Sequence, residues 1–273
     1  MPNRLILAAP ILAMCLSLAL SGCEADAPRG AHAAEVPDFS GHWEHTIAHF
    51  LPPKEGPGPV VNMPGLEFTA INVWVGDYRN PILQPWAANA VKEHDIAELD
   101  SGEVLREQLQ LCLPLGVPNV ILLREPVELL QEAGSVTFLY HHDSQVRRVQ
   151  LNGTHPENIA PSPYGHSVGH YEGDTLVIDS IGFSNTGPID YYGTPHTDTL
   201  HVVERYRVVD EGSILEVRLT VSDPDAFTTE WSAVQRYRRS DAGTLFRENI
   251  CAENVRFELG GEYPVPTDTT PDF

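Results

Sequence analysis

Positive charge is scarce in this 273-residue chain, which has 17 Lys and Arg residues against 38 Asp and Glu residues and a formal net charge of −21. A surface this acidic repels phosphate backbones and anionic lipid headgroups. We therefore expect no nucleic-acid partner and no electrostatic docking on a membrane. The charge indicates a solvated surface and carries no catalytic information by itself.

Metal-binding spacings and internal repeats are also lacking. The sequence has no Cys-x-x-Cys, His-x-His or His-Glu-x-x-His motif, so we expect neither a bound metal nor a cofactor.

The 21 glycines and 23 prolines make turns frequent and argue against long helices. With 42% hydrophobic and 20% charged residues, the composition is typical of a globular protein and excludes a disordered or collagen-like chain.

The N-terminal residues have the pattern of an export signal. A basic start, Met1 to Arg4, precedes an apolar run over residues 5–20 that is short for a membrane span. The run ends in Leu20-Ser21-Gly22-Cys23, which resembles a bacterial lipobox, and anchoring through more than one acyl chain is stable. We predict a signal peptide over 1–22, a lipidated tether over 23–35 that begins at Cys23, and a single β-rich domain over 36–273.

These boundaries predict an exported protein in the periplasm that touches a membrane only through the Cys23 lipid, with the outer membrane favoured. The alternative is ordinary cleavage after Ala33, which follows small residues.

Two of the four cysteines, Cys112 and Cys251, remain once Cys15 and Cys23 are assigned to the leader and the lipid. In an oxidising compartment one disulfide between them is the natural inference, and two separate buried thiols are the alternative.

Alternating apolar and polar residues predict strands through most of the domain. Residues 214–221 are the clearest case, and the turn at 210–212 joins them to 201–209 as a hairpin. The same pattern predicts further strands at residues 136–140, 146–151, 167–171, 175–181 and 229–239.

We therefore predict a mainly β fold, an antiparallel lipocalin-like barrel, with a β-sandwich as the alternative. One or two short helices are expected near residues 86–109, because Pro85 suits a first helical turn and Ser101-Gly102 would break the segment. Gly41-His42-Trp43 is similar to the Gly-x-Trp start of lipocalin-like (calycin) barrels, a resemblance that implies a Trp plugging one end of the barrel.

A Gly-x-Ser-x-Gly sequence surrounds Ser167, and Asp179 or Asp198 and then His201 follow in the order of an α/β-hydrolase triad. A true nucleophile elbow requires strand, turn and helix, whereas the residues after Ser167 read as strand, turn and strand. A serine hydrolase using Ser167 is therefore only a second alternative.

Histidines offer a different chemistry, because imidazole exchanges protons near neutral pH. His166 and His170 share one face of a predicted strand, His142 and Asp143 follow another, and His201 begins a third. Arg147 and Arg148 are adjacent on a strand, so only one of them can point inward, where it would need a carboxylate or an anionic ligand.

Several blocks resemble a family of exported bacterial proteins of unknown activity: Cys112 to Pro118, Arg147 to Gly153, Gly165 to Asp179, His201 to Arg205, and Cys251 to Glu253. The Glu-Gly-Asp-Thr-Leu sequence at 172–176 is the most specific part. The resemblance implies one exported domain and supports a paired late cysteine. The chain departs from it at Asn152-Gly153-Thr154, at Tyr171 and at Ala252.

These observations together predict a lipid-anchored periplasmic barrel that binds a small, partly apolar molecule in its interior. Metal-independent acid–base chemistry of a lyase, isomerase or hydrolase type would act on that molecule, with His142 or His166 as proton acceptor and Arg148 steadying negative charge. A non-catalytic binding or scaffold lipoprotein is the alternative, and the oligomeric state stays open. The predicted polar residues of the site are His142, Asp143, Arg148, His166, His170 and His201.

Overall fold

The hairpin predicted around residues 210–212 is present in the computed structural model, which describes residues 36–46, 50–64, 75–101, 112–122 and 125–240. Strand β7 (His201–Val209) pairs with β8 (Ile214–Ser222) along its whole length. The short helical turn η3 (Asp210–Gly212) connects them, with left-handed φ angles of 51° at Asp210 and 57° at Glu211. Leu215, Val217, Leu219 and Val221 on β8 are fully buried, as the alternation predicted.

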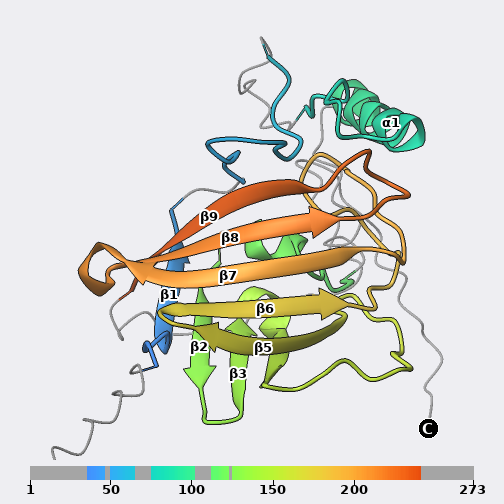
Figure 1. Cartoon of the computed structure of the whole chain (residues 1–273). Coiled ribbons are helices and arrows are strands. Elements are labelled where there is room, and N and C mark those ends of the chain that lie inside the picture. Colours follow the sequence, from blue (N-terminus) through green and yellow to red (C-terminus); the bar gives the residue numbers. More distant parts are fainter. Residues whose placement is uncertain (1–35, 47–49, 65–74, 102–111, 123–124, 241–273) are drawn as a thin grey trace, which may run out of the picture. The chain divides into compact units, whose positions relative to one another are not determined.

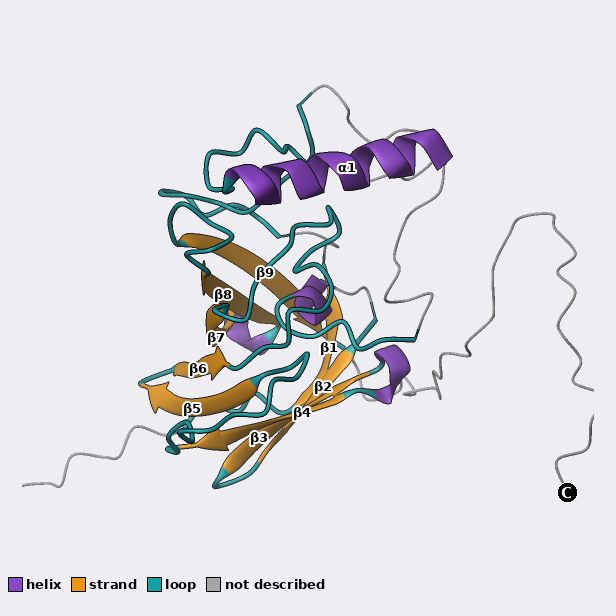
Figure 2. Cartoon of the chain, turned by 90° about the vertical axis from the view of Figure 1, so that its right-hand side faces the viewer, coloured by secondary structure: helices purple, strands orange, loops and turns teal. Residues whose placement is uncertain are grey.

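Within the described residues nine strands close into a barrel in chain order (Figures 1 and 2). The remaining strands are β1 (Gly41–His45), β2 (Val127–Gln131), β3 (Ser135–Tyr140), β4 (Val146–Leu151), β5 (His166–Glu172), β6 (Thr175–Ile181) and β9 (Trp231–Arg239). Strand β1 pairs with both β2 and β9 and so closes the ring. The predicted barrel is confirmed and the sandwich is excluded.

Neighbouring strands are antiparallel except for one pair. Strands β4 and β5 run parallel, with Gln150 opposite Val168 and Leu151 opposite Gly169. Gly169 allows this close packing, because a Cβ there would lie 2.9 Å from a methyl group of Val149. The parallel pair requires the chain to return along the barrel between residues 152 and 165.

Helix α1 (Pro85–Ser101) begins at the proline that predicted it, while residues 102–111, and with them the expected break after Ser101, lie outside the described part. Ala87 and Val91 on the inner side of the helix are buried, and the Trp86 indole donates to the Asp225 carbonyl at 2.7 Å.

By its contacts the chain divides into Met1–Glu35 and Val36–Phe273, and every described residue belongs to the second unit. Among the described helices, none combines the length and hydropathy of a membrane span.

Trp43 on β1 is completely buried. Its indole N–H donates to the Phe39 carbonyl at 2.9 Å, and the Arg239 guanidinium lies over its ring, 4.1 Å from the centroid. A cation held over an indole is a favourable contact that also covers the ring.

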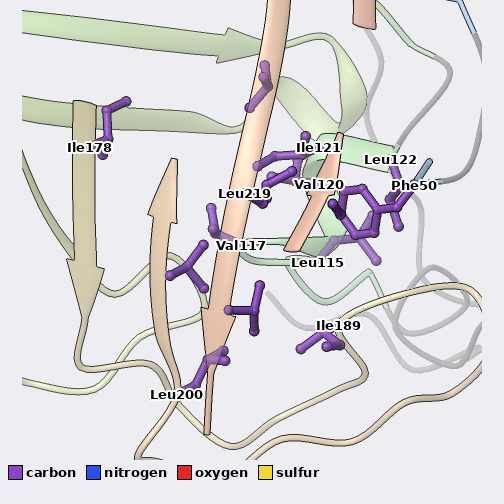
Figure 3. Close-up of a cluster of buried hydrophobic side chains, with 14 of the residues drawn as sticks. Phe50, Leu115, Val117, Val120, Ile121, Leu122, Ile178, Ile189, Leu200 and Leu219 are labelled. Carbon is purple, nitrogen blue, oxygen red and sulfur yellow. The ribbon is translucent and has the colours of Figure 1, made fainter. Parts of the chain in front are cut away.

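The short helix η1 (Asn119–Leu122) fills part of the barrel interior. All four of its residues are buried, and the inward-facing Tyr237 of β9 donates its hydroxyl to the Ile121 carbonyl at 3.0 Å. Figure 3 shows Val120 and Ile121 beside Leu219 of β8. The turn before η1 requires Gly116, where a Cβ would lie 2.2 Å from the Pro163 carbonyl oxygen.

Candidate functional site

Of the two adjacent arginines on β4, Arg147 points into the barrel and Arg148 points out. Arg147 is only 2% exposed and makes a two-pronged ion pair with the fully buried Glu204 of β7. The distances are 2.9 Å from Nη1 to Oε2 and 2.5 Å from Nη2 to Oε1. The predicted need of an inward arginine for a carboxylate is thus met by the protein itself.

Hydroxyl groups complete this interior network. Arg147 also donates to Ser167 Oγ at 3.0 and 3.2 Å and to Ser180 Oγ at 2.8 Å, and Tyr206 donates to Glu204 at 2.6 Å. Burial, and next the negative charge of Glu204, raise the pKa of Tyr206 well above its ordinary value, so it stays a donor. A network with its charges matched in this way stabilises one arrangement of the core.

Ser167 also belongs to this network. It lies within β5 on the inward face, where its Oγ accepts from Arg147 and shares a 2.9 Å hydrogen bond with Ser180. Strand β5 leads through a turn into β6, so no helix follows, and the elbow geometry is absent from this part of the described chain. At Ser167 the described structure therefore does not have the geometry that the serine-hydrolase alternative requires.

The expected interior site is corrected, because the alternation of the strands sends its residues outward. The inward positions are 147, 149 and 151 on β4, 167 and 169 on β5, and 202, 204 and 206 on β7. Arg148, His166, His170 and His201 occupy the intervening outward positions. The prediction that they line the interior is therefore wrong, and the interior holds the Arg147 network and the apolar core.

Four of the outward side chains form one hydrogen-bonded group, which we call the imidazole cluster: His155, His166, Asp179 and His201. His155 Nδ1 lies 2.9 Å from His166 Nδ1, and His155 Nε2 lies 2.9 Å from Asp179 Oδ1. The second oxygen of Asp179, Oδ2, lies 2.8 Å from His201 Nε2. His166 begins β5, Asp179 lies near the end of β6, His201 begins β7, and His155 comes from the return segment.

The contacts of the cluster are satisfied by the following set of protons. Asp179 can only accept when ionised, so both His155 Nε2 and His201 Nε2 donate to it. A neutral His155 then accepts at Nδ1, and His166 Nδ1 must be the donor. His166 Nε2 is left as a lone pair, the proton acceptor at the end of an Asp–His–His chain.

Burial, and secondarily the neighbouring His155, lower the pKa of His166 below its ordinary value. Its imidazole is therefore neutral at pH 7, as a proton acceptor must be. The cluster is partly covered: the His155 side chain is 19% exposed and the His201 side chain 40%. Solvent therefore reaches the cluster.

His170 lies on the same outward side of β5 but in a separate ion-pair group. Its Nε2 is 3.1 Å from Glu172, which also pairs with Arg205. The two bonds hold the pKa of the Glu172 carboxyl below its usual value, first through Arg205 and then through His170. Exposed groups paired in this way are typical of a barrel surface.

His142 and Asp143 are placed elsewhere by the fold. They lie in the short helix η2 (His142–Ser144) between β3 and β4, where His142 is half-buried. None of the hydrogen bonds that hold the imidazole cluster together involves His142, and the Asp143 side chain lies outside the described part. Of the six predicted residues, the cluster therefore brings together His166 and His201.

His155 was missed from sequence, and Asp179 was considered only as a member of the rejected triad. His155 follows β4 in an irregular segment, where no periodicity predicts the direction of a side chain. Asp179 could have been found, because alternation along residues 175–181 puts it on the outward face beside His201. In the described part of the chain no three or more His, Cys, Asp and Glu residues are arranged to hold a metal ion.

In comparison with known proteins, no family model matches the chain and no curated protein matches its sequence.

Proposed function

We propose that this protein carries out acid–base chemistry on a small molecule at the outer face of β5, β6 and β7, with His166 as the proton acceptor. The observation that carries the proposal is the chain Asp179–His155–His166, in which each contact is within 2.9 Å. A carboxylate that orients an imidazole and stabilises its charged form is a recurring way to make a general base.

In the proposed step, His166 Nε2 takes a proton from the substrate or from a water that attacks it. The positive charge that forms on His166 is shared through its Nδ1–H with His155 Nδ1. Asp179 stabilises that charge through His155 Nε2–H. His201 donates to the other oxygen of Asp179 and keeps the carboxylate in place. The proton returns from His166 to the leaving group, so the site ends as it began.

The test uses 4-nitrophenyl acetate, an ester whose hydrolysis requires only a general base or an imidazole. We expect hydrolysis by the wild type at pH 7.5, and His166→Gln to lower the rate by about 10²- to 10⁴-fold, the usual contribution of a positioned acid–base group. His170→Gln on the same face of β5 is the matched control and should stay within about twofold of the wild type. Equal rates for the wild type and His166→Gln would overturn the proposal.

A second candidate is a non-catalytic binding or scaffold lipoprotein. The packed interior favours it, since η1 and the Arg147–Glu204 network occupy the space in which a barrel usually holds a ligand. The same assay discriminates, because a scaffold would show no hydrolysis that depends on His166.

Export, lipid attachment at Cys23 and a Cys112–Cys251 disulfide belong to the proposal as well. They rest on the sequence, and Cys23 and Cys251 lie outside the described residues. A Cys23→Ser variant should leave the membrane fraction, and the wild-type N-terminus should carry acyl chains by mass spectrometry.

A further inference from the structure

Arg148 differs from the other arginines on the barrel strands. Each of the other arginines on the barrel strands contacts a carboxylate or an aromatic ring. The pairs are Arg147 with Glu204, Arg205 with Glu172, Arg207 with Asp174, Arg218 and Arg236 with Glu216, Arg238 with Glu44, and Arg239 with Trp43. Within the described ranges, no acidic side chain lies within ion-pair distance of Arg148. It is exposed on the outward face of β4.

Continued by two residues, the register of the parallel pair places Arg148 opposite His166, a member of the imidazole cluster. Gln150 lies opposite Val168, and Arg148 and His166 each come two residues earlier on their strands. On the inward face the two strands are also connected at this level, because the long Arg147 side chain reaches Ser167, with Nε 3.2 Å from Oγ. Because alternate residues share a face, Arg148 and His166 both project outward from neighbouring positions.

A guanidinium ion presents a planar fork of donors that matches an oxyanion, and it stays charged at any physiological pH. The chain as a whole carries a net charge of −21, so its general field repels anions. An unpaired arginine on this part of the barrel is thus a local exception on an acidic surface.

We propose that Arg148 binds an anionic group of the substrate, so that the site takes small organic oxyanions, with a carboxylate or phosphate held at Arg148 and the reacting centre at His166. The inference rests on the proposed function, and it names the class of substrate. Arg148 is the binding residue and His166 the proton acceptor, so the two should affect different kinetic constants.

The kinetic test compares two esters with the same leaving group: neutral 4-nitrophenyl benzoate and the anionic mono-4-nitrophenyl terephthalate, whose carboxylate cannot reach its own ester. We expect wild-type kcat/KM to favour the anionic ester, and Arg148→Gln to remove about tenfold of that preference, mainly through KM. Arg148→Lys should retain part of it as a point charge. Arg238→Gln, which removes another exposed outward arginine, is the matched control and should keep the preference.

A binding test separates this inference from the proposed function. Succinate and inorganic phosphate are titrated into the protein while the ring nitrogens of His166 are followed by NMR. Shifts with either anion in the wild type, lost in Arg148→Gln and kept in Arg238→Gln, support the inference even if neither ester is hydrolysed. Hydrolysis that depends on His166 without any anion preference, or an absence of shifts with both anions, overturns the inference. If hydrolysis does not depend on His166, the proposed function itself fails.

Discussion

Asp179 holds two imidazoles at once, one on each carboxylate oxygen, and this makes it the residue on which the cluster depends. Replacing it by Asn keeps the size of the side chain, but an amide nitrogen cannot accept from an imidazole N–H. One of the two histidines must then turn or change its tautomer. We expect Asp179→Asn to lower kcat for 4-nitrophenyl acetate by about 10²-fold or more with little change in KM.

A change in KM alone would contradict this role for Asp179. The His155→Gln variant provides a comparison, because removing the middle imidazole should lower kcat by a similar factor. Both variants should retain the circular dichroism spectrum of the wild type.

The lowered pKa of His166 predicts the pH dependence of the reaction. A base with a pKa below its ordinary 6.5 remains neutral in mildly acidic solution. The rate should therefore fall only below pH 6.5, as His166 is protonated next to His155, Asp179 and His201. A pH–rate profile that is half-maximal at or above the pKa of free imidazole would contradict this assignment.

Arg147 is the residue whose loss should cost the most stability. Its truncation leaves Glu204 charged, buried and without its partner, and breaking a buried pair in this way typically costs about 3–5 kcal/mol. We expect Arg147→Met to lower the free energy of unfolding in urea by about this amount. Arg147→Met combined with Glu204→Leu should recover most of the loss, whereas Arg148→Met on the outer face should change stability by less than about 0.5 kcal/mol.

At the scale of single elements, a buried aspartate of helix α1 accepts a hydrogen bond from the loop that precedes the helix. Asp95 is 2% exposed, and its Oδ1 accepts from the Gly76 amide at 2.9 Å. Gly76 is necessary there, because a Cβ would lie 2.8 Å from Tyr192 and 2.9 Å from Val91. Burial, and to a smaller extent the carboxylates of Glu98 and Asp190, raise the pKa of Asp95 to about 7.

This raised pKa implies that stability falls as the pH rises. Between the ordinary 3.8 and about 7, the folded protein keeps a proton on Asp95 that the unfolded chain has lost. We expect Asp95→Asn to raise the free energy of unfolding by about 1–3 kcal/mol at pH 8 and to have little effect near pH 4. Denaturant melts at both pH values measure the difference, with Asp77→Asn in the same loop as the control. A gain of equal size at both pH values would show that titration of Asp95 is not the cause.

The strands differ in how well the sequence predicts them. The sequence predicts strands at residues 146–151, 175–181 and 201–209, and β4, β6 and β7 have these bounds. The sequence pattern did not identify β2 as a strand, because Val127–Gln131 is short and its alternation is weak. Alternation also separates Arg147 from Arg148, but it does not say which of them is buried. That choice depends on the inward Glu204, which is 57 residues away in the chain.

For the molecule as a whole, the predicted link between Cys112 and Cys251 would close a loop of more than a hundred residues. In the chain-entropy account such a link contributes about 4–5 kcal/mol, and native disulfides typically contribute about 2–5 kcal/mol. We expect a reducing agent to lower the free energy of unfolding within that range. The double variant Cys112→Ala, Cys251→Ala should be insensitive to the reductant, and an insensitive wild type would contradict the pairing.

The parallel contact between β4 and β5 follows from a rule of counting. In a closed ring, neighbours can alternate in direction all the way round only if their number is even, so nine strands leave at least one place where two must run the same way. At that place the chain must return along the barrel before the next strand begins. Here the returning segment brings His155 into contact with His166, the first residue of β5. A barrel with one strand more or one strand fewer would not need a parallel pair. It would therefore not need the returning segment that supplies His155 to the cluster.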